Sequence, residues 1–248
     1  MGFFMLTLIE ILKKHQPGFN TVIPFNAVTD KIEHFDLSAT NKEITEDIFS
    51  DTKLFAAFID TKRNRAGALY LIGGYNELRE MYKRSVLFDF EKKTDNFVST
   101  NIVREEPRRL HLGIDIWGYS GTKVFAPLGG TVHSYAYNDN YGDYGATIIL
   151  QHQIEMVTFY TLYGHLSKAD LKEMRKGRFI TRGECFAHFG QEHENGNWPP
   201  HLHFQVIEDI GSYEGDYPGV CKESEKEKYL HNCPDGDLIL GLNKFVAK

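Results

Sequence analysis

The stretch YGATIILQHQIEMVTFYTLYGHL, residues 144–166, contains two β-rich runs with four residues between them. Runs rich in Ile, Val, Thr and Tyr that are bounded by glycine are typical of strands. Five more runs of this kind surround the pair: HLGIDIW (111–117), TKVFAPL (122–128), GTVHSYAY (130–137), ECFAHFG (184–190) and HLHFQVI (201–207). Short strands at this spacing predict a compact, mainly antiparallel β domain, which we place at residues 101–210.

Residues 1–100 have a different pattern of apolar and polar residues, which predicts a mixed α/β region. Leu6, Ile9 and Leu12 recur at helical spacing, so we expect a short amphipathic helix near the N-terminus. Further along, the sequence predicts a strand, a helix and a polar linker, at residues 67–72 (GALYLI), 75–84 and 92–101 respectively.

Thr40 and Glu43 have the spacing of a capping box, which predicts a helix that opens near Lys42. At the other end of the chain, residues 211–248 are loop-rich, and we expect them to pack on the β domain as a C-terminal extension. The predicted fold class is therefore α+β, with a mixed α/β region, a mainly antiparallel β domain and an extension.

The composition excludes several functional classes. The net charge is −6 with both signs mixed along the chain, whereas nucleic-acid binders usually present a basic face. No run of about 18 apolar residues occurs, so no membrane span is expected. Three widely spaced cysteines indicate a reducing compartment rather than a disulfide framework. The sequence leaves the oligomeric state open.

The N-terminal apolar run does not have the form of an export signal. Glu10 interrupts it, and no small-residue cleavage site follows. We therefore expect a cytoplasmic location, or a periplasmic or cell-envelope location if a leader precedes this sequence.

The first segment that carries chemistry is His111-Leu-Gly-Ile-Asp115. Alternation along a strand places the aliphatic residues on one face and His111 with Asp115 on the other. Four residues of an ideal strand span about 13 Å, too far for two ligands of one metal. The backbone must therefore bend between them, and Gly113 stands where a bend is easiest.

Three further histidines stand in strand-like contexts. In Pro200-His-Leu-His-Phe204, His201 and His203 share a face, and His165 ends the run VTFYTLYGHL. Two histidines and one carboxylate leave an open position on a tetrahedral metal, which is typical of catalytic zinc. The residues alone leave open whether these side chains bind a metal or are histidines bonded to the backbone.

The motifs HLGID, YGHL and HLHF, in this order, resemble the signature of lysostaphin-type, or LytM-like, zinc endopeptidases. APLGGTV (126–132) and YGATIILQH (144–152) also resemble strands of that family, and the likeness covers residues 104–207. The resemblance implies a small catalytic domain of the barrel-sandwich hybrid type with one zinc ion in a groove.

Matched to that signature, His111, Asp115 and His203 would be the zinc ligands, and His165 and His201 the catalytic histidines. The implied activity is zinc-dependent hydrolysis of a peptide or amide bond, and peptidoglycan cross-link peptides are the family's usual substrates. Neither nucleic acid nor a membrane is an expected partner.

Two alternatives remain from the sequence. A histidine phosphocarrier like the sugar-transport IIA domain would use paired histidines for phosphoryl transfer, and a regulatory module would hold zinc without hydrolysis. Several other residues are secondary candidates: His152 beside the site, Arg108 or Arg109 for a substrate carboxylate, Tyr141, Tyr144 and Trp198 as groove walls, and His231 with Cys233 as a second metal site.

Overall fold

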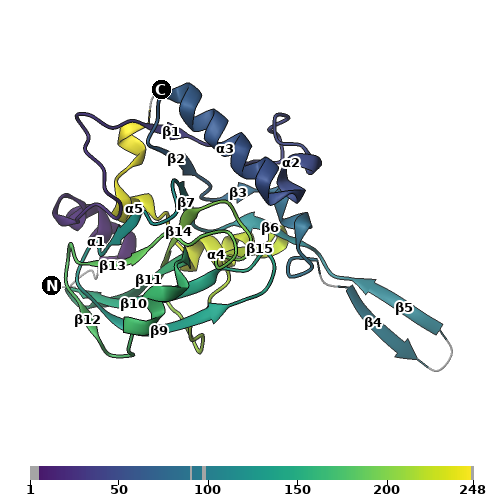
Figure 1. The fold of residues 1–248 in the computed structure, drawn as a ribbon. Coiled ribbons are helices and arrows are strands. Elements are labelled where there is room, and N and C mark those ends of the chain that lie inside the picture. The colour runs from purple at the N-terminus through teal and green to yellow at the C-terminus, as the bar shows by residue number, and fades with distance from the viewer. Residues whose placement is uncertain (1–5, 90, 97–98, 247–248) are drawn as a thin grey trace.

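A computed structural model describes residues 6–89, 91–96 and 99–246, and its centre is an eight-stranded sheet (Figure 1). The strands run in the order β1 (Ile32–His34), β2 (Tyr70–Gly73), β7 (Ile114–Trp117), β14 (His201–Ile207), β11 (Val157–Leu166), β10 (Gly145–Ile154), β9 (Gly130–Asn138) and β12 (Phe179–Ile180). Every neighbouring pair is antiparallel except β1 and β2. The predicted α+β class, dominated by antiparallel strands, is confirmed, and β1 and β12 form the edges of an open sheet.

Smaller sheets flank this one. β6 (Arg108–His111) lies between β15 (Val220–Lys222) and β3 (Glu77–Leu78), and β8 (Lys123–Phe125) pairs with β13 (Cys185–His188). The seven β-rich runs of the sequence are all strands in the structure, with HLGIDIW divided between β6 and β7.

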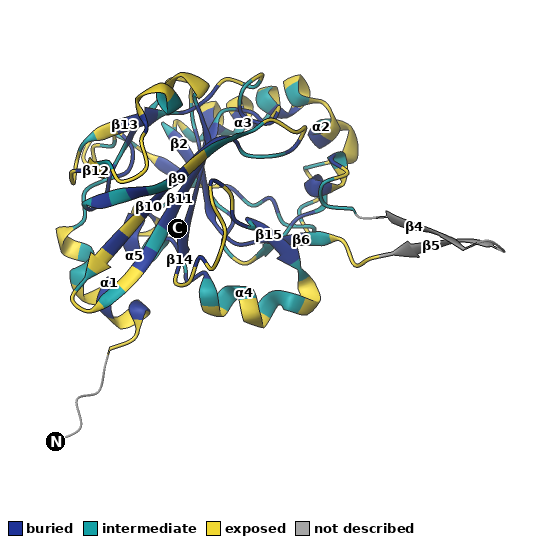
Figure 2. Cartoon of the chain, turned by 90° about the horizontal axis from the view of Figure 1, so that it is seen from below, coloured by how far each residue is buried: buried dark blue, intermediate teal, exposed yellow. Residues whose placement is uncertain are grey.

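Both faces of the large sheet are covered, which explains why its central strands are almost continuously apolar. In β10, Ile148 and Leu150 pack in the largest core cluster, whereas Ile149 faces a second cluster with Leu162 of β11. Burying each such side chain contributes roughly 1.5–3 kcal/mol. Figure 2 shows the buried residues along the strands and the exposed ones on the outer sides of the helices.

The predicted N-terminal helix is present as α1 (Leu8–His15), but its buried face differs from the expected one. Leu8 and Ile11 are buried beside Leu12, whereas Leu6 and Ile9 are exposed. Thr7 caps the helix and forms a capping box with Glu10, so the helix begins at Leu8, two residues after the first residue of the predicted stripe. A 3-10 helix, η1 (Gln16–Gly18), follows.

The helix predicted near Lys42 is wrong. The helices begin later, as α2 (Glu46–Ser50) and α3 (Thr52–Ala66), and Asp51 caps α3 by accepting from two backbone amides. Thr40 instead bonds to Ser38, and Glu43 pairs with Lys62 of α3.

Two other expectations for the first hundred residues are corrected. Residues 75–84 form β3 and a 3-10 helix, η2 (Glu80–Arg84), rather than one α-helix, because β3 pairs with β6. The predicted linker contains a hairpin, β4 (Glu91–Asn96) and β5 (Ser99–Arg104), which extends away from the sheets in Figure 1. The polar composition of this hairpin concealed its strands.

The later helical elements are short: η3 (Lys168–Glu173), η4 (Glu223–Glu225), α4 (Lys226–Asn232), α5 (Asp237–Leu240) and η5 (Asn243–Phe245). Ile239 and Leu240 of α5 belong to the same core cluster as Ile114 of β7. In the described part of the chain, none of the helices has the length and apolar character that a bilayer span requires.

Candidate metal centre and the cavity beside it

The chain bends sharply between His111 and Asp115, as their spacing requires. β6 ends at His111 in the small sheet, and β7 begins at Ile114 in the large one, so the intervening turn changes sheets. A Cβ atom on Gly113 would lie 2.5 Å from Cε1 of His203 and 2.8 Å from the carbonyl oxygen of Phe204. Only glycine therefore lets the turn approach β14 this closely.

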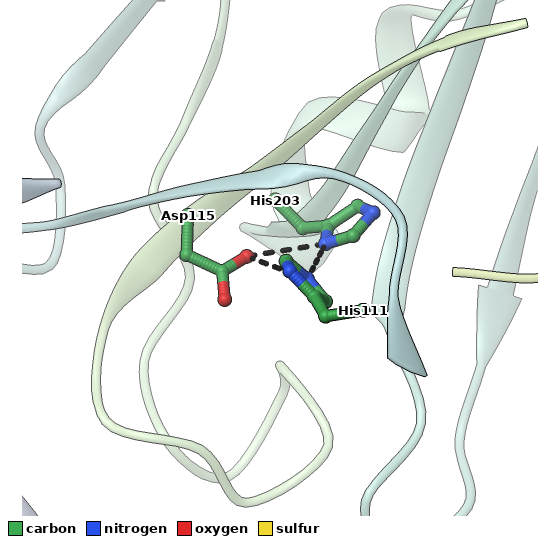
Figure 3. Close-up of side chains that lie close together, drawn as sticks. All are labelled: His111, Asp115 and His203. Carbon is green, nitrogen blue, oxygen red and sulfur yellow. Dashed lines mark hydrogen bonds and ion pairs between the residues drawn. The ribbon is translucent and has the colours of Figure 1, made fainter. Parts of the chain in front are cut away.

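The bend brings three donor side chains together, as Figure 3 shows. Asp115 is the direct cross-strand partner of His203, and Oδ1 of Asp115 lies 3.1 Å from Nδ1 of His203. Nε2 of His111 lies 2.9 Å from the same Nδ1 and 3.3 Å from the same carboxylate oxygen. All three residues are at most 2% exposed, so these donors converge in an interior site.

The remaining polar atoms of both histidines are already engaged. Nδ1 of His111 donates to the carbonyl oxygen of Gly74 at 2.8 Å. Nε2 of His203 lies 2.9 Å from Oε1 of Gln205, whose amide nitrogen donates to the carbonyl of Pro218. These acceptors fix the tautomers, so each histidine turns its lone-pair nitrogen toward Asp115.

Three acceptor atoms about 3 Å apart repel one another unless a cation or a proton lies among them. Two imidazole nitrogens and a carboxylate oxygen are the donor set that zinc prefers, and three protein ligands leave a position open. The residues present therefore fit a single zinc ion.

The electrostatics of the site keep its donors in the forms that bind metal. Burial, together with the positive charge of Arg79, lowers the pKa of His111 to about 4. Burial would raise the pKa of Asp115, but His111 and Arg79 outweigh it and hold this pKa well below its usual range. At neutral pH, His111 is therefore neutral and Asp115 is ionised.

His165 and His201 form a second pair directly beside the donors. Their ring centroids are 4.1 Å apart, and Nε2 of His201 lies 4.0 Å from Oδ1 of Asp115. Each Nδ1 lies 2.8 Å from a carbonyl oxygen, that of Asn195 for His165 and that of Pro199 for His201. Each ring therefore donates through Nδ1 and keeps its lone pair on Nε2.

β11 is irregular at His165, whose ring packs against that of His201. The register between β10 and β11 shifts near this point, and His165 has φ of 60°, in the left-handed region that non-glycine residues seldom adopt. Burial lowers the pKa of His165 well below its usual value and that of His201 to about 4. Both rings are therefore neutral at pH 7.

All five histidine and aspartate side chains line one cavity of about 310 Å³. Tyr144 and Trp198 are also in its wall, as is Arg108. Tyr141 instead contacts Arg84, and Arg109 pairs with Asp89.

The other secondary candidates lie elsewhere. His152 is bonded to the Gly129 carbonyl and to Thr161, away from the cavity wall. Cys233 is buried and accepts from Gln205, and within the described residues the only three-donor group is His111, Asp115 and His203. His231 and Cys233 are therefore not part of a second metal site of this kind.

Sequence reasoning did not find Arg79 or Gln205. Arg79 lies in a segment predicted to be helical, and Gln205 shares the strand and face of His203 two residues later. The even spacing of His201, His203 and Gln205 was the one signal available.

The described residues form a mainly antiparallel β protein with a buried three-donor group that could hold a metal ion. The family model described as Peptidase family M23 matches residues 109–214, so this part of the chain is an M23 peptidase domain. The resemblance to lysostaphin-type peptidases, which rested on HLGID, YGHL and HLHF, is thereby confirmed. None of the curated proteins matches the chain.

The chain is similar to several solved structures. One is a zinc-containing peptidase from Vibrio cholerae, at 25% identity over 48% of this chain and 31% of that one, with a TM-score of 0.32. Another is the catalytic domain of the antimicrobial peptidase lysostaphin from Staphylococcus simulans. It is 23% identical over 48% of this chain and 80% of that one, with a TM-score of 0.34. A third is Csd3 from Helicobacter pylori, which is 19% identical over 63% of this chain and 37% of that one, with a TM-score of 0.31. This chain thus spans about a third of the length of the first and third.

Proposed function

We propose that this protein is a zinc-dependent endopeptidase that hydrolyses an amide bond of a peptide, with peptidoglycan cross-link peptides as its substrate class. The observation that carries the proposal is the convergence of His111, Asp115 and His203 beside the open pair His165 and His201, all in one cavity. The match of residues 109–214 to an M23 peptidase supports it.

His111, Asp115 and His203 would hold the zinc ion. Bound zinc supplies a Lewis acid that polarises a carbonyl group and lowers the pKa of water. The contacts to Gly74 and Gln205 keep both histidine rings oriented, so the donors need little rearrangement when the ion binds.

His165 and His201 would accept and donate protons during the reaction. Both are neutral at pH 7, and the lone pair on each Nε2 can accept a proton. Once protonated, Nε2 can donate to the leaving nitrogen or stabilise a developing negative charge on oxygen. The rigid Nδ1 contacts orient both rings for this role.

The site geometry disfavours the phosphocarrier alternative. A phosphoryl group on His111 or His203 would bring its negative charge within a few ångströms of ionised Asp115, because both lone-pair nitrogens point at that carboxylate. The same arrangement attracts a cation.

The test measures release of new amino groups from cross-linked peptidoglycan and from defined cross-link peptides. Zinc-loaded protein should cleave these substrates, a chelator should abolish cleavage, and added zinc should restore it. As a control, His188→Ala changes a histidine that pairs with Asp170 outside the cavity and should leave activity intact. Zinc-loaded protein that cleaves no peptide or amide substrate would refute the proposal and leave the non-catalytic module as the remaining explanation.

A further inference from the structure

Arg79 is a buried arginine that contacts the metal centre from outside the M23 segment. It is 1% exposed, and its Nη1 donates to Oδ2 of Asp115 at 2.5 Å. The other oxygen, Oδ1, is the one that faces His111 and His203. One carboxylate oxygen of Asp115 therefore contacts the arginine, and the other contacts the two histidine donors.

Arg79 is itself held in place from two sides. Its Nε donates to Glu77 at 2.6 Å, and the other oxygen of Glu77 accepts from the backbone amide of Leu37. Its backbone amide bonds to the carbonyl of Arg109 in β6, the strand that ends at His111. The guanidinium is therefore fixed relative to both Asp115 and His111.

Gly74 connects the arginine with the histidine. A Cβ atom on Gly74 would lie 2.0 Å from Nη2 of Arg79 and 2.8 Å from Nδ1 of His111, and the Gly74 carbonyl accepts from that same nitrogen. Tyr82 adds a contact of 3.4 Å between its hydroxyl and Nη1. Residues 74–82 thus orient two of the three donors, although they precede the segment 109–214 that matches the family.

We propose that Arg79 is a positioning residue of the metal centre, which holds Oδ2 of Asp115 so that Oδ1 alone is presented to the ion. The inference rests on the zinc site of the proposed function but not on the peptidase activity. Hydrogen-bonded partners of metal ligands typically contribute 10- to 100-fold to metal affinity, and a charged, rigidly held partner belongs to this class.

A merely structural arginine would behave differently, and the chain offers a matched control. Arg63 of α3 is also buried, at 2% exposed, pairs with one carboxylate at Asp60, and packs on Tyr119 outside the cavity. Replacing Arg63 tests the cost of losing a buried arginine without touching the site.

The experiment measures zinc affinity by competition with a chromophoric chelator, and the visible spectrum of the cobalt-substituted protein, for wild type, Arg79→Gln, Arg79→Lys and Arg63→Gln. We expect Arg79→Gln to bind zinc about 10- to 100-fold more weakly and to shift the cobalt bands, because Asp115 is free to rotate. Arg79→Lys keeps the charge but cannot reach Glu77 and Asp115 together, so it should resemble Arg79→Gln. Arg63→Gln should match wild type in both readouts.

Folded Arg79→Gln with wild-type affinity and an unchanged cobalt spectrum would overturn the inference, as would full affinity in Arg79→Lys or an equal loss in Arg63→Gln. If Arg79→Gln does not fold because Glu77 is left unpaired, Glu77→Gln/Arg79→Gln removes both charges and must show the same loss of affinity. Wild type that binds zinc but hydrolyses nothing would refute the proposed function and leave this inference standing. Wild type without zinc affinity would overturn both.

Discussion

Replacing Gly113 with alanine should disable the metal centre through a single added methyl group. The new Cβ would lie 2.5 Å from Cε1 and 2.6 Å from Nε2 of His203, and 2.8 Å from the backbone oxygen of Phe204. Ordinary contacts of this kind begin near 3.4 Å, so the imidazole must move by roughly 1 Å. Metal sites tolerate errors of only about 0.2 Å in ligand position.

Two quantities should change. Overpacking of this kind costs about 1–3 kcal/mol of unfolding free energy, and each kcal/mol lowers Tm by roughly 2–4 °C for a chain of this size. Zinc affinity should fall by at least about 10-fold, because the displaced His203 also loses its bond to Gln205.

The assay combines thermal unfolding of the metal-free protein with zinc titration against a competing chelator. Gly18→Ala is the control, since a Cβ atom there meets nothing within 4 Å and the residue has no positive φ. Zinc affinity equal to wild type in Gly113→Ala would refute the argument that Gly113 is required for the approach of the turn to β14.

Two further predictions concern the histidines. His165→Ala and His201→Ala should each lower kcat by about 100-fold or more while the zinc content stays at wild-type level, and parallel loss of zinc would contradict their assignment to proton transfer. His152 has a pKa lowered by burial to about 4. Its stabilising contribution is therefore fully present above its unfolded pKa near 6.5 and is lost as pH falls toward 4, by about 3 kcal/mol. Urea unfolding of the metal-free protein across this range should show a smaller pH slope for His152→Asn, and an unchanged slope would contradict the account.

The sequence predicted the strands well because their physical signal is local. The runs around Ile148 and Leu162 are apolar on both faces, and β-branched and aromatic residues dominate them. The bend at Gly113 could also be predicted, since two ligands of one metal cannot lie four residues apart on a straight strand.

The errors arose where tertiary contacts outweigh local preference. Thr40 and Glu43 have capping-box spacing, yet Glu43 pairs with Lys62, and the true cap is Asp51. Residues 75–84 have helical spacing, but β6 offers β3 a strand partner.

Little of the support around the metal centre could be predicted from the sequence, beyond the even spacing of Gln205 from His203 along one strand. Arg79 is 36 positions from Asp115, and Gln205 is bonded to His203 through an amide whose orientation depends on Pro218. Only the folded chain brings these groups to the donors, because β3, β6 and β14 come from distant parts of the sequence.

The most direct test of the central claim is the zinc content of purified wild-type protein compared with His203→Ala. The account predicts one zinc ion per wild-type chain and its loss in the variant, because removing Nδ1 leaves only His111 and Asp115 as donors. Wild-type protein that holds no zinc after equilibration with the metal, or His203→Ala that retains a full equivalent, would contradict it.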